Sequence, residues 1–573
     1  MTSKWNYCPL TPSQQAAEAR LAERYSSTPP ISRLLAIRGI DSVREAELFF
    51  HPSLRELHDP FLMPDMERAV ARLNRALGSK EKIMVYGDYD VDGTTAVALV
   101  YKYLRNFSSN IDYYIPTRAE DGYGISHATI DMAAERGFSL FIVLDCGIKA
   151  TEEVVYARER GIDFIICDHH VADDILPPAA AILNPKLPGS GYPCPHLSGC
   201  GVGYKLMQAF AISNGLSTAD LEGMLDLVAV SIAADIVPMV GENRILTHFG
   251  LQRLNSNPNM GLRAIIRVCG LAGKEITISD VIFKIGPRIN AAGRMQSGKE
   301  AVDILVCRDM AEALERAREI DRHNEERKEL DRRTTEEAVA LLEAETDLDK
   351  RKSIVIYHPD WHQGIIGIVA SRITEQHHRP TVVLTQSGDL ATGSSRSVQG
   401  FDVYSAVGSM RDLLENFGGH TYAVGLSLRS ENIPEFKRRF EQYVAANIDP
   451  EQLAPSINID AYLNFADLSP EFLTLLRRFN PYGPGNSKPI FCTRGVRDFG
   501  TGKIVGKSGE HLKLDLTDET SGKVYSGIAF NALPYFDHIH AGKPFDICYT
   551  IEENRRKGSR SVQLLIKEIK ITP

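Results

Sequence analysis

Three carboxylates lie close together in the segment 86–95, which reads Tyr-Gly-Asp-Tyr-Asp-Val-Asp-Gly-Thr-Thr. They belong to Asp88, Asp90 and Asp92. Like charges at this spacing repel one another unless cations bind between them, and hard divalent cations prefer oxygen ligands. The competing interpretation is a polar turn that caps the next helix, and for an isolated Asp-x-Asp this is the simpler one. The segment alone leaves both open.

Two further polar clusters follow apolar runs that are typical of buried strands. Asp145 follows Phe141–Leu144, and Asp168-His169-His170 comes shortly after Phe164–Ile166. In a parallel sheet the carboxyl ends of the strands meet at one edge, so these clusters are expected to converge with the first. An imidazole beside carboxylates suits Mn²⁺, Zn²⁺ or Fe²⁺. The polar-turn interpretation therefore weakens.

A fourth acidic position, Asp235, follows the apolar run Leu227–Ala234. Taken alone, it would be a residue at the end of a helix. Together with the other carboxylates, Asp235 becomes a candidate metal ligand.

The elements that must position these side chains alternate between strands and helices from Lys82 onward. This alternation predicts an α/β domain with a parallel, doubly wound sheet. The expected strands are Ile83–Tyr86, Tyr113–Ile115, Phe141–Leu144 and Phe164–Ile166, and the expected helices are Thr94–Arg105, Thr129–Glu135 and Thr151–Arg160.

The pattern changes several times along the chain. Helical spacing predicts a mostly helical N-terminal segment, with amphipathic stretches at Ser32–Ile40 and Ser42–Phe50. A highly charged stretch predicts a long connector helix, and period-2 alternation near the C-terminus predicts a small β-barrel. The expected division is a helical segment at 1–80, the α/β domain at 81–308, the connector at 309–349, a second, smaller α/β domain at 350–450 and the barrel at 453–573.

The bulk composition is that of an ordinary globular protein. Of 573 residues, 43% are hydrophobic and 24% charged, and no apolar run approaches the roughly 20 residues that a membrane-spanning helix requires. The nine cysteines are scattered without a Cys-x-x-Cys pair, as expected of reduced thiols in the cytoplasm. The net charge of −9 argues weakly against a nucleic-acid partner, because a total charge hides local basic patches.

Three other segments could contact an oxyanion. Residues 286–295 place Arg288, Asn290 and Arg294 in what is predicted to be a tight, glycine-flanked turn. Ordinary salt bridging would explain either arginine alone. Residues 392–397 and 417–421 are predicted to be glycine-rich turns that offer backbone amides, hydroxyls, a guanidinium and an imidazole.

In order and context these motifs resemble those of the DHH phosphoesterase superfamily, named for the triplet seen here as Asp168-His169-His170. The resemblance extends over nearly the whole chain to the RecJ family. It implies a pair of divalent cations, Mn²⁺ or Mg²⁺, with Asp145 in the bridging position and His170 facing the substrate phosphate. Some superfamily members have a metal-binding histidine where this chain has Tyr86. The implied ligands are Asp90, Asp92, Asp145, His169 and Asp235, with Asp88 as a further ligand or base.

The same resemblance implies how substrate would be held. Arg288 or Arg294 would contact DNA phosphate, together with Asn290. The second α/β domain resembles the DHH-associated domain, and the barrel resembles an oligonucleotide-binding fold. Its 555–560 loop would follow single-stranded DNA, or would be a solvated hairpin tip, and the sequence favours neither. The residues implied to hold the terminal 5′-phosphate and its surroundings are Ser394, Arg396, Arg118, Gly418, Gly419 and His420.

The activity implied by this resemblance is 5′→3′ exonuclease hydrolysis of single-stranded DNA in the cytoplasm by a monomer. A single-strand-binding protein and a RecQ-type helicase are the implied protein partners. One alternative is a phosphodiesterase of short oligonucleotides or cyclic dinucleotides, although the barrel and connector exceed what a small substrate requires. The other is a non-catalytic single-strand-binding scaffold, whose signature would be loss of the acidic ligands.

Overall fold

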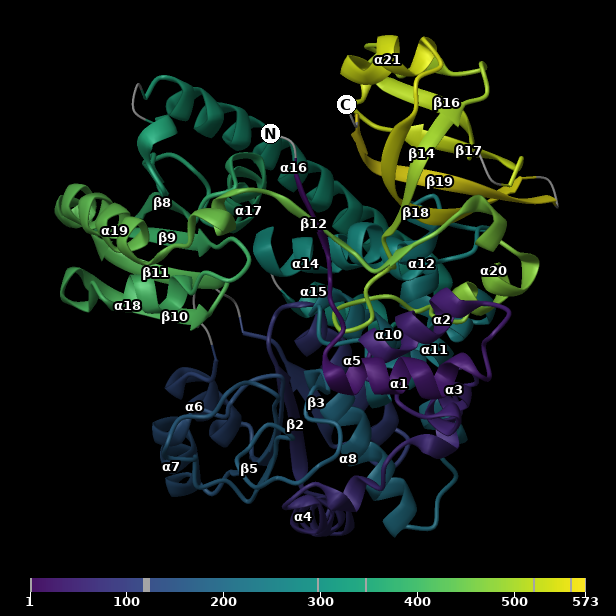
Figure 1. Cartoon of the computed structure of the whole chain (residues 1–573). Helices are drawn as coiled ribbons and strands as arrows, with labels where there is room; N and C mark the ends of the chain where they lie inside the picture. The colour runs from purple at the N-terminus through teal and green to yellow at the C-terminus, as the bar shows by residue number, and fades with distance from the viewer. Residues whose placement is uncertain are drawn as a thin grey trace. The chain divides into compact units, whose positions relative to one another are not determined.

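The computed structural model describes residues 3–116, 124–295, 298–345, 348–518, 521–556 and 559–571. Its contacts divide the chain into two compact units, which are described separately (Figure 1). The larger unit comprises Trp5–Gly286, Gly298–Leu314 and Ile457–Pro573. The smaller unit comprises Met1–Lys4, Pro287–Ser297 and Glu315–Ser456.

The larger unit contains the predicted parallel sheet. Its five strands run in the order β3-β2-β4-β5-β6, and every neighbouring pair is parallel. The strands are β2 (Lys82–Gly87), β3 (Ile111–Tyr114), β4 (Phe138–Leu144), β5 (Asp163–Cys167) and β6 (Ala181–Leu183). The four predicted strands all lie in this sheet, so the α/β prediction for this part of the chain is confirmed.

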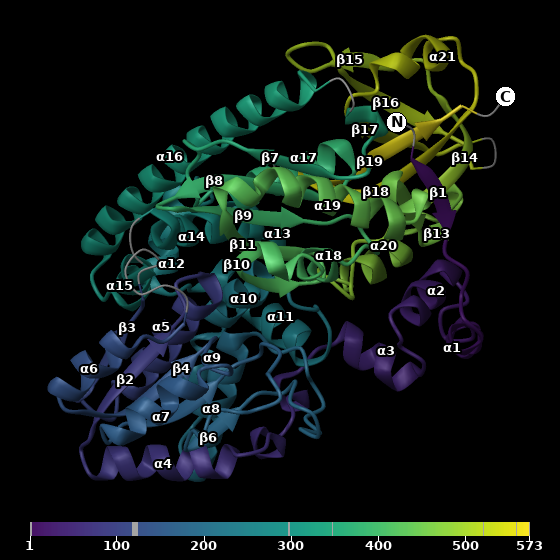
Figure 2. The same cartoon turned by 90° about the vertical axis from the view of Figure 1, so that its left-hand side faces the viewer.

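Helices cover both faces of the sheet (Figure 2). On one face, α6 (His127–Glu135) and α7 (Thr151–Glu159) pack on alternate strand residues such as Met84, Phe141 and Ile166. On the other face, α5 (Val91–Leu104) and α8 (Gly199–Ser213) contact the strands, and α10 (Leu225–Ala234) packs on both of these helices. The remaining helices here are α4 (Met66–Gly78), α9 (Ala219–Glu222), α11 (Gly241–Ser256), α12 (Met260–Val268), α13 (Ile278–Asp280) and α15 (Gly298–Val306).

A five-stranded barrel forms the C-terminal part of the larger unit. Strands pair in the order β14-β18-β19-β17-β16, and a β14–β16 pairing closes the ring, which leaves no open edge among these five strands. The barrel strands are β14 (Phe491–Asp498), β16 (His511–Thr517), β17 (Val524–Ala529), β18 (Phe545–Arg556) and β19 (Ser559–Lys570). The barrel is thus confirmed. Of the 555–560 segment predicted as a loop, residues 555–556 belong to β18 and 559–560 to β19, and residues 557–558 lie outside the described residues.

The N-terminal helices share one hydrophobic core with this barrel. They are α1 (Pro12–Ala22), α2 (Pro29–Ile37) and α3 (Val43–Phe50). Leu34, Leu35 and Phe50 pack in the same cluster as Phe491 and Tyr549 of the barrel. The helix α20 (Pro470–Arg477) contributes Phe472 to the cluster. Burial against the barrel explains why the two ends of the chain fold together.

The smaller unit holds a mixed sheet in the order β10-β11-β9-β8-β7, in which β7 and β8 are parallel and the other pairs antiparallel. One face packs on α17 (Ile366–His377) and the end of α16 (Met310–Glu343), and the other on α18 (Val403–Gly408) and α19 (Ile433–Asn447). The long helix α16 confirms the predicted connector. The strands are β7 (Ile354–Tyr357), β8 (Thr381–Ser387), β9 (Leu390–Arg396), β10 (Leu414–His420) and β11 (Ala423–Arg429).

Within the part of the chain that the structure describes, no helix is both long enough and apolar enough to cross a membrane.

Candidate metal centre

Three carboxylates of the first motif lie where β2 gives way to α5. Asp88 directly follows the strand and accepts a hydrogen bond from the Tyr89 amide at 2.8 Å. Asp90 is the N-cap of α5 and accepts from the Gly93 amide at 3.0 Å. Both the helix cap and the cluster of carboxylates expected from the sequence are therefore present. The two are compatible because the N-terminus of a helix stabilises negative side chains.

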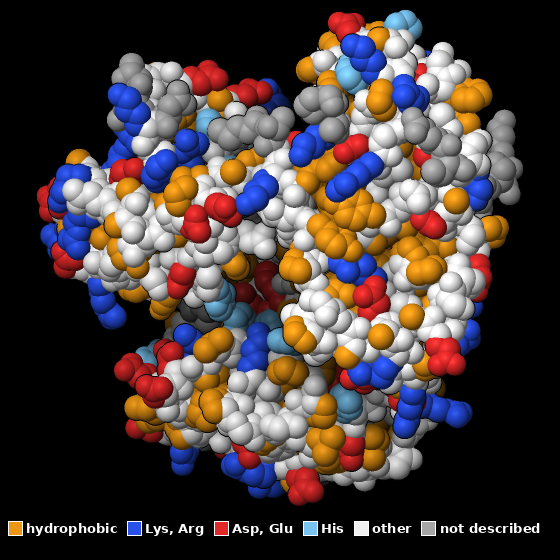
Figure 3. Space-filling model, viewed as in Figure 1, with side chains coloured by type: hydrophobic (Ala, Val, Ile, Leu, Met, Phe, Trp, Pro, Cys, Tyr) orange, Lys and Arg blue, Asp and Glu red, His pale blue; other side chains and the backbone are white. Residues whose placement is uncertain are grey.

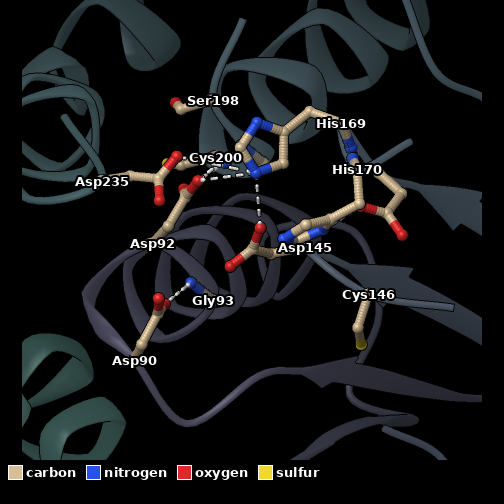
Figure 4. A network of polar contacts seen from close by, with 12 residues as sticks. Asp90, Asp92, Gly93, Asp145, Cys146, His169, His170, Ser198, Cys200 and Asp235 are labelled. Carbon is tan, nitrogen blue, oxygen red and sulfur yellow. Dashed lines mark hydrogen bonds and ion pairs between the residues drawn. The ribbon is translucent and has the colours of Figure 1, made fainter. Parts of the chain in front are cut away.

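Asp92 is oriented by two other helices. Its two carboxylate oxygens accept hydrogen bonds from the amides of Gly199 and Cys200, each at 2.7 Å, in the first turn of α8. The Ser231 hydroxyl of α10 donates to the same carboxylate at 2.7 Å. Figure 4 shows Cys200 beside Asp92. Asp92 is almost fully buried, so these donors fix its direction as well as its charge.

Asp145 stands at the end of β4 in a left-handed backbone conformation, with φ of 61°. Aspartate tolerates this conformation better than most residues. A methyl group on Gly199 would lie 2.6 Å from the Asp145 Cβ and 2.7 Å from its Oδ1. Gly199 therefore leaves the space in which the Asp145 side chain lies.

His169 lies at the centre of the cluster (Figure 4). Its Nε2 is 3.1 Å from Asp145 Oδ1, 3.6 Å from Asp235 Oδ2 and 3.8 Å from Asp92 Oδ2. Both ring nitrogens of His169 and the Oδ1 of Asp145 are buried without a hydrogen-bond partner among the described residues. Buried polar atoms normally have partners, so these atoms are well suited to hold a cation.

Asp168 differs in role from His169 and His170, the other two residues of the triplet. Its carboxylate accepts hydrogen bonds from the amides of His169, His170 and Ile148 at 2.7–3.0 Å. It also contacts the Nδ1 of His170 at 2.7 Å. Burial would raise the pKa of Asp168, but these bonds and the His170 charge lower it to about 2. Asp168 thus shapes the turn and orients His170.

The electrostatics of the cluster are unfavourable without cations. Burial, followed by the charge of Asp90, raises the pKa of Asp88 to about 8. Burial, followed by Asp92 and Asp90, raises the pKa of Asp235 to about 8 as well. The pKa of Asp145 is raised well above its usual range by the same causes. Burial lowers the pKa of His169 to about 4, which keeps its imidazole neutral and able to bind a metal.

Three sets of donor atoms among the described residues are compact enough to hold a metal ion, and the ligand atoms of each set lie within 4.8 Å of one another. The sets are Asp92–His169–Asp235, Asp88–Asp90–Asp145 and Asp145–His169–His170. Carboxylate oxygens with one imidazole fit Mn²⁺ or Mg²⁺ better than a thiolate-seeking metal. The sequence motifs singled out as candidate ligands are therefore brought together at one sheet edge.

Neutralising one carboxylate of the cluster is expected to stabilise the metal-free protein in a pH-dependent way. A carboxyl whose pKa is raised in the folded state loses stability as pH rises from its unfolded pKa through the folded one, here from about 4 to about 8. Asp235→Asn removes this titration. In EDTA, the melting temperature of the variant should exceed that of the unmodified protein by more at pH 8.5 than at pH 5.

The metal supplies the control for this prediction. With Mn²⁺ present, Asp235→Asn should melt at a lower temperature than the unmodified protein, because binding stabilises the native state. A difference in EDTA that stays constant across the pH range would contradict the prediction.

A methyl group at position 199 is expected to disturb Asp145 directly. Overpacking a well-packed site costs about 1–3 kcal/mol, and Gly199→Ala should also weaken Mn²⁺ binding by about tenfold or more. The matched control is Gly201→Ala, two residues along the same helix, where a methyl group approaches Ser198 and Leu197 at 3.3–3.5 Å. Calorimetric titration of both variants with Mn²⁺ separates them, and equal affinities would refute the steric argument.

Tyr86, at the position where some superfamily members have a histidine, belongs to the core. Its ring stacks between Tyr114 and Phe141, with centroids 5.8 and 6.1 Å away. Its hydroxyl donates to the Gly124 carbonyl at 2.6 Å. The side chain is fully buried in the cluster beneath α6 and α7, so Tyr86 has a packing role.

Several residues predicted to bind substrate lie in the smaller unit. The 286–295 segment is a helix, α14 (Gly286–Met295), so the predicted turn was wrong. Arg288 on this helix donates to Asp321 at 2.7 Å, which is the salt bridge that the simpler interpretation expected. Asn290 lies on the same helix. Arg118 and the side chain of Arg294 are outside the described residues.

The two glycine-rich segments predicted as turns are strands instead. Ser394 and Arg396 lie on β9, while Gly418, Gly419 and His420 lie on β10. The strand β11 lies between them, and its Gly425 pairs with both Ser394 and Gly418. Strands rather than turns form here because a methyl group on Gly419 would meet the Ala423 carbonyl at 2.2 Å, so the glycines permit close pairing.

Arg396 lies beside the N-terminus of a helix. Its guanidinium donates to the Ser394 hydroxyl at 2.9 Å and to the Ser395 carbonyl at 2.8 Å, and no carboxylate among the described residues pairs with it. A methyl group on Gly367, in the first turn of α17, would lie 3.0 Å from the guanidinium. A cation and uncapped helix amides together favour an anion.

Sequence reasoning missed the residues that orient the ligands. Ser198, Gly199, Cys200 and Ser231 were not singled out, although the Ser-Gly-Cys-Gly run at 198–201 has the composition of a helix start. The α8 amides that bond Asp92 are more than a hundred residues away along the chain. Backbone donors leave no signature in side-chain type, so they could not be identified from the sequence.

Comparison with known proteins gives matches along most of the chain. Residues 82–232 match the DHH family N-terminal domain, 350–446 the DHHA1 domain and 459–568 the RecJ OB domain. The single-stranded-DNA-specific exonuclease RecJ of Haemophilus influenzae is 35% identical over 96% of this chain and 98% of its own. RecJ of Escherichia coli is 35% identical over 94% and 96%.

Solved structures agree with these matches. The crystal structure of RecJ from Thermus thermophilus in complex with Mn²⁺ superposes with a TM-score of 0.84 at 28% identity, covering 100% of this chain and 80% of that one. The same protein in complex with Mg²⁺ gives a TM-score of 0.76 at 26% identity, over 100% and 79%. Both metals named there are ones that the donor set of this chain suits.

Proposed function

Because the chain belongs to the RecJ family of single-stranded-DNA-specific exonucleases, we propose that it hydrolyses single-stranded DNA from the 5′ end and releases 5′-mononucleotides. The observation that carries this proposal is the intact donor set of Asp88, Asp90, Asp92, Asp145, His169 and Asp235 at one sheet edge. A scaffold that had lost catalysis would not need to keep so many buried carboxylates together.

The donor set fits a pair of divalent cations, Mn²⁺ or Mg²⁺. Asp92, His169 and Asp235 would hold one, Asp88 and Asp90 the other, and Asp145 would lie between them. When bound, such cations lower the pKa of water and stabilise the charge that develops on phosphoryl oxygens. The bonds from α8 and Ser231 keep the Asp92 carboxylate in place, so little reorganisation is required during the reaction.

His170 is proposed to contact the scissile phosphate. Burial would lower its pKa, but its hydrogen bond to Asp168 and the Asp168 charge raise the value above normal. About a third of the side chain is exposed, and Nδ1 is engaged with Asp168. Nε2 can therefore donate a proton or a hydrogen bond to a phosphate oxygen.

End selection is proposed to reside in the smaller unit. Ser394, Arg396 and the N-terminus of α17 offer a hydroxyl, a guanidinium and backbone amides to a terminal 5′-phosphate. Gly418, Gly419 and His420 line exposed positions of the same sheet. Arg118 is proposed to assist at the terminal 5′-phosphate, and Arg288, Asn290 and Arg294 are proposed to contact other DNA phosphates.

The barrel is proposed to bind the downstream single strand, as oligonucleotide-binding folds do. A single-strand-binding protein and a RecQ-type helicase are proposed partners, and we expect the chain to act as a monomer. The cysteines of the described residues form no disulfide, which supports a reducing cytoplasm as the place of action.

Hydrolysis of 5′-labelled and 3′-labelled single-stranded DNA, with Mn²⁺ or Mg²⁺, tests the proposal. Labelled mononucleotide should be released at once from the 5′-labelled strand, and only late from the 3′-labelled one. Blunt duplex and EDTA are the controls. Intact long DNA beside cleaved dinucleotides would favour a small-substrate phosphodiesterase, and binding without cleavage would favour a scaffold.

A further inference from the structure

The chain next to Asp235 is held in an unfavourable conformation. Ile236 adopts a left-handed backbone conformation with φ of 57°, and its side chain is 61% exposed. A β-branched residue in this region is an outlier, and such strain costs of order 1–3 kcal/mol. Because the Ile236 side chain is exposed, hydrophobic burial does not offset this cost. Neighbouring structure must therefore hold the segment 236–240 in place.

One side of this segment is tied to α11. The Asn243 side-chain amide donates to the Pro238 carbonyl at 3.0 Å and to the His196 carbonyl at 2.5 Å. Asn243 is fully buried. The bond at Pro238 fixes the chain three residues beyond the candidate ligand.

The other side rests on the loop 481–486, which precedes the barrel strand β14. The Met239 amide donates to the Pro484 carbonyl at 2.6 Å. A methyl group on Gly483 would lie 2.9 Å from the Met239 Cβ, and one on Gly485 would lie 2.9 Å from the Val240 Cγ1. The absence of a side chain at these two glycines therefore leaves the space in which the Met239 and Val240 side chains lie.

The loop is itself rigidly held. The Asn486 side chain donates to the carbonyls of Phe479 and Pro481 at 2.7 and 2.8 Å. Arg38, the C-cap of α2, donates to the Asn486 side chain at 2.7 Å and to the Ser487 carbonyl at 2.6 Å. These bonds connect the loop to the N-terminal helices that share the barrel core.

The opposite side of the loop is open. Tyr482, Gly483 and Pro484 help to line a groove of about 1900 Å³ between α11–α12 and α20, where Figure 3 shows hydrophobic side chains with basic ones among them beneath the barrel. Tyr482 also packs against the barrel core, so the loop is held by this packing together with its own hydrogen bonds and the contact with Met239.

We propose that the loop 481–486 is a positioning element for the metal centre, which it serves by holding Asp235 through Met239 and Val240. The inference rests on the proposed function, since it assigns Asp235 to a cation. Gly483, Gly485 and Met239 are then positioning residues that touch neither substrate nor metal. The barrel and the metal centre are in this way joined by a short, hydrogen-bonded path.

Gly485→Ala and Gly495→Ala form a matched pair that tests the proposal. Both glycines have positive φ, 75° and 65° respectively, and both precede or lie in β14. A methyl group on Gly495 meets nothing within 4 Å, whereas one on Gly485 meets Val240. Both substitutions destabilise the fold by placing alanine at a positive φ. Gly485→Ala alone should weaken Mn²⁺ binding, by about tenfold.

Calorimetric titration with Mn²⁺ and no DNA is the readout, with melting temperatures measured in EDTA. Because no nuclease assay is involved, a failed exonuclease proposal and a failed positioning proposal remain distinguishable. If Gly485→Ala folds poorly, Met239→Ala removes the side chain next to Gly483 without a steric clash and should weaken Mn²⁺ binding severalfold. Unchanged Mn²⁺ affinity in the folded variant, or an equal loss in Gly495→Ala, would overturn the proposal.

Discussion

Asp145→Asn is expected to lower kcat on single-stranded DNA by at least about a thousandfold, with little change in fold. Asparagine has nearly the same shape and tolerates the left-handed backbone that Asp145 adopts. The change removes the charge of a carboxylate that belongs to two of the three donor sets. Metal stabilisation of the transition state is worth several kcal/mol, and each ~1.4 kcal/mol is about tenfold in rate.

The measurement is single-turnover release of mononucleotide from a 5′-labelled strand at saturating Mn²⁺. Asp131→Asn is a matched control in the same domain, because Asp131 is a surface carboxylate paired with Arg160, and such pairs contribute little. Asp131→Asn should retain its rate. A rate for Asp145→Asn within tenfold of the unmodified protein would show that the cluster is not the reaction centre.

The convergence of the candidate ligands could be predicted because it follows from sheet geometry. Asp88, Asp145 and His169 each come just after a buried strand, and parallel neighbours place such positions at one edge. Asp235 was harder to assign, because it ends a helix rather than a strand. Asp235 became a candidate ligand because of the other carboxylates, and the family resemblance added to this. The packing of α10 on α5 and α8 supplies the physical reason.

Contacts between distant segments could not be predicted. The amide of Gly199 that bonds Asp92, and the Met239 contact with Pro484, join segments that no local pattern relates. The glycine-rich runs were wrongly predicted as turns because glycine composition signals a turn unless a neighbouring strand is known. The 286–295 segment was wrongly predicted as a turn for a similar reason, because flanking glycines do not exclude a helix. The shared core of α2, α3 and the barrel could not be predicted either, because a hydrophobic face does not show which element it packs against.

Arg396→Ala is expected to abolish most of the preference for a 5′-phosphorylated end. The guanidinium is largely buried and has no carboxylate partner among the described residues, and burial lowers its pKa. A phosphate would therefore supply the missing counter-charge. Hydrogen bonds to charged groups contribute about 1.5–3 kcal/mol, so the ratio of kcat/KM for 5′-phosphate over 5′-hydroxyl strands should fall about ten- to hundredfold.

Comparing 5′-phosphate with 5′-hydroxyl forms of one oligonucleotide separates a loss of end recognition from a general loss of activity in the variant. Loss of general DNA binding would lower kcat/KM on both strands alike and leave the ratio unchanged, which is the outcome that contradicts the assignment. Arg429→Ala on the adjacent strand β11 is the matched control, because Arg429 is exposed and already paired with Glu415 at 2.9 Å. Arg396→Lys should restore the preference only in part, since lysine keeps the charge but loses the planar, two-pronged geometry that matches a phosphate. The graded order of arginine, lysine and alanine would identify the geometry of the guanidinium, and not its charge alone, as the feature that selects the end.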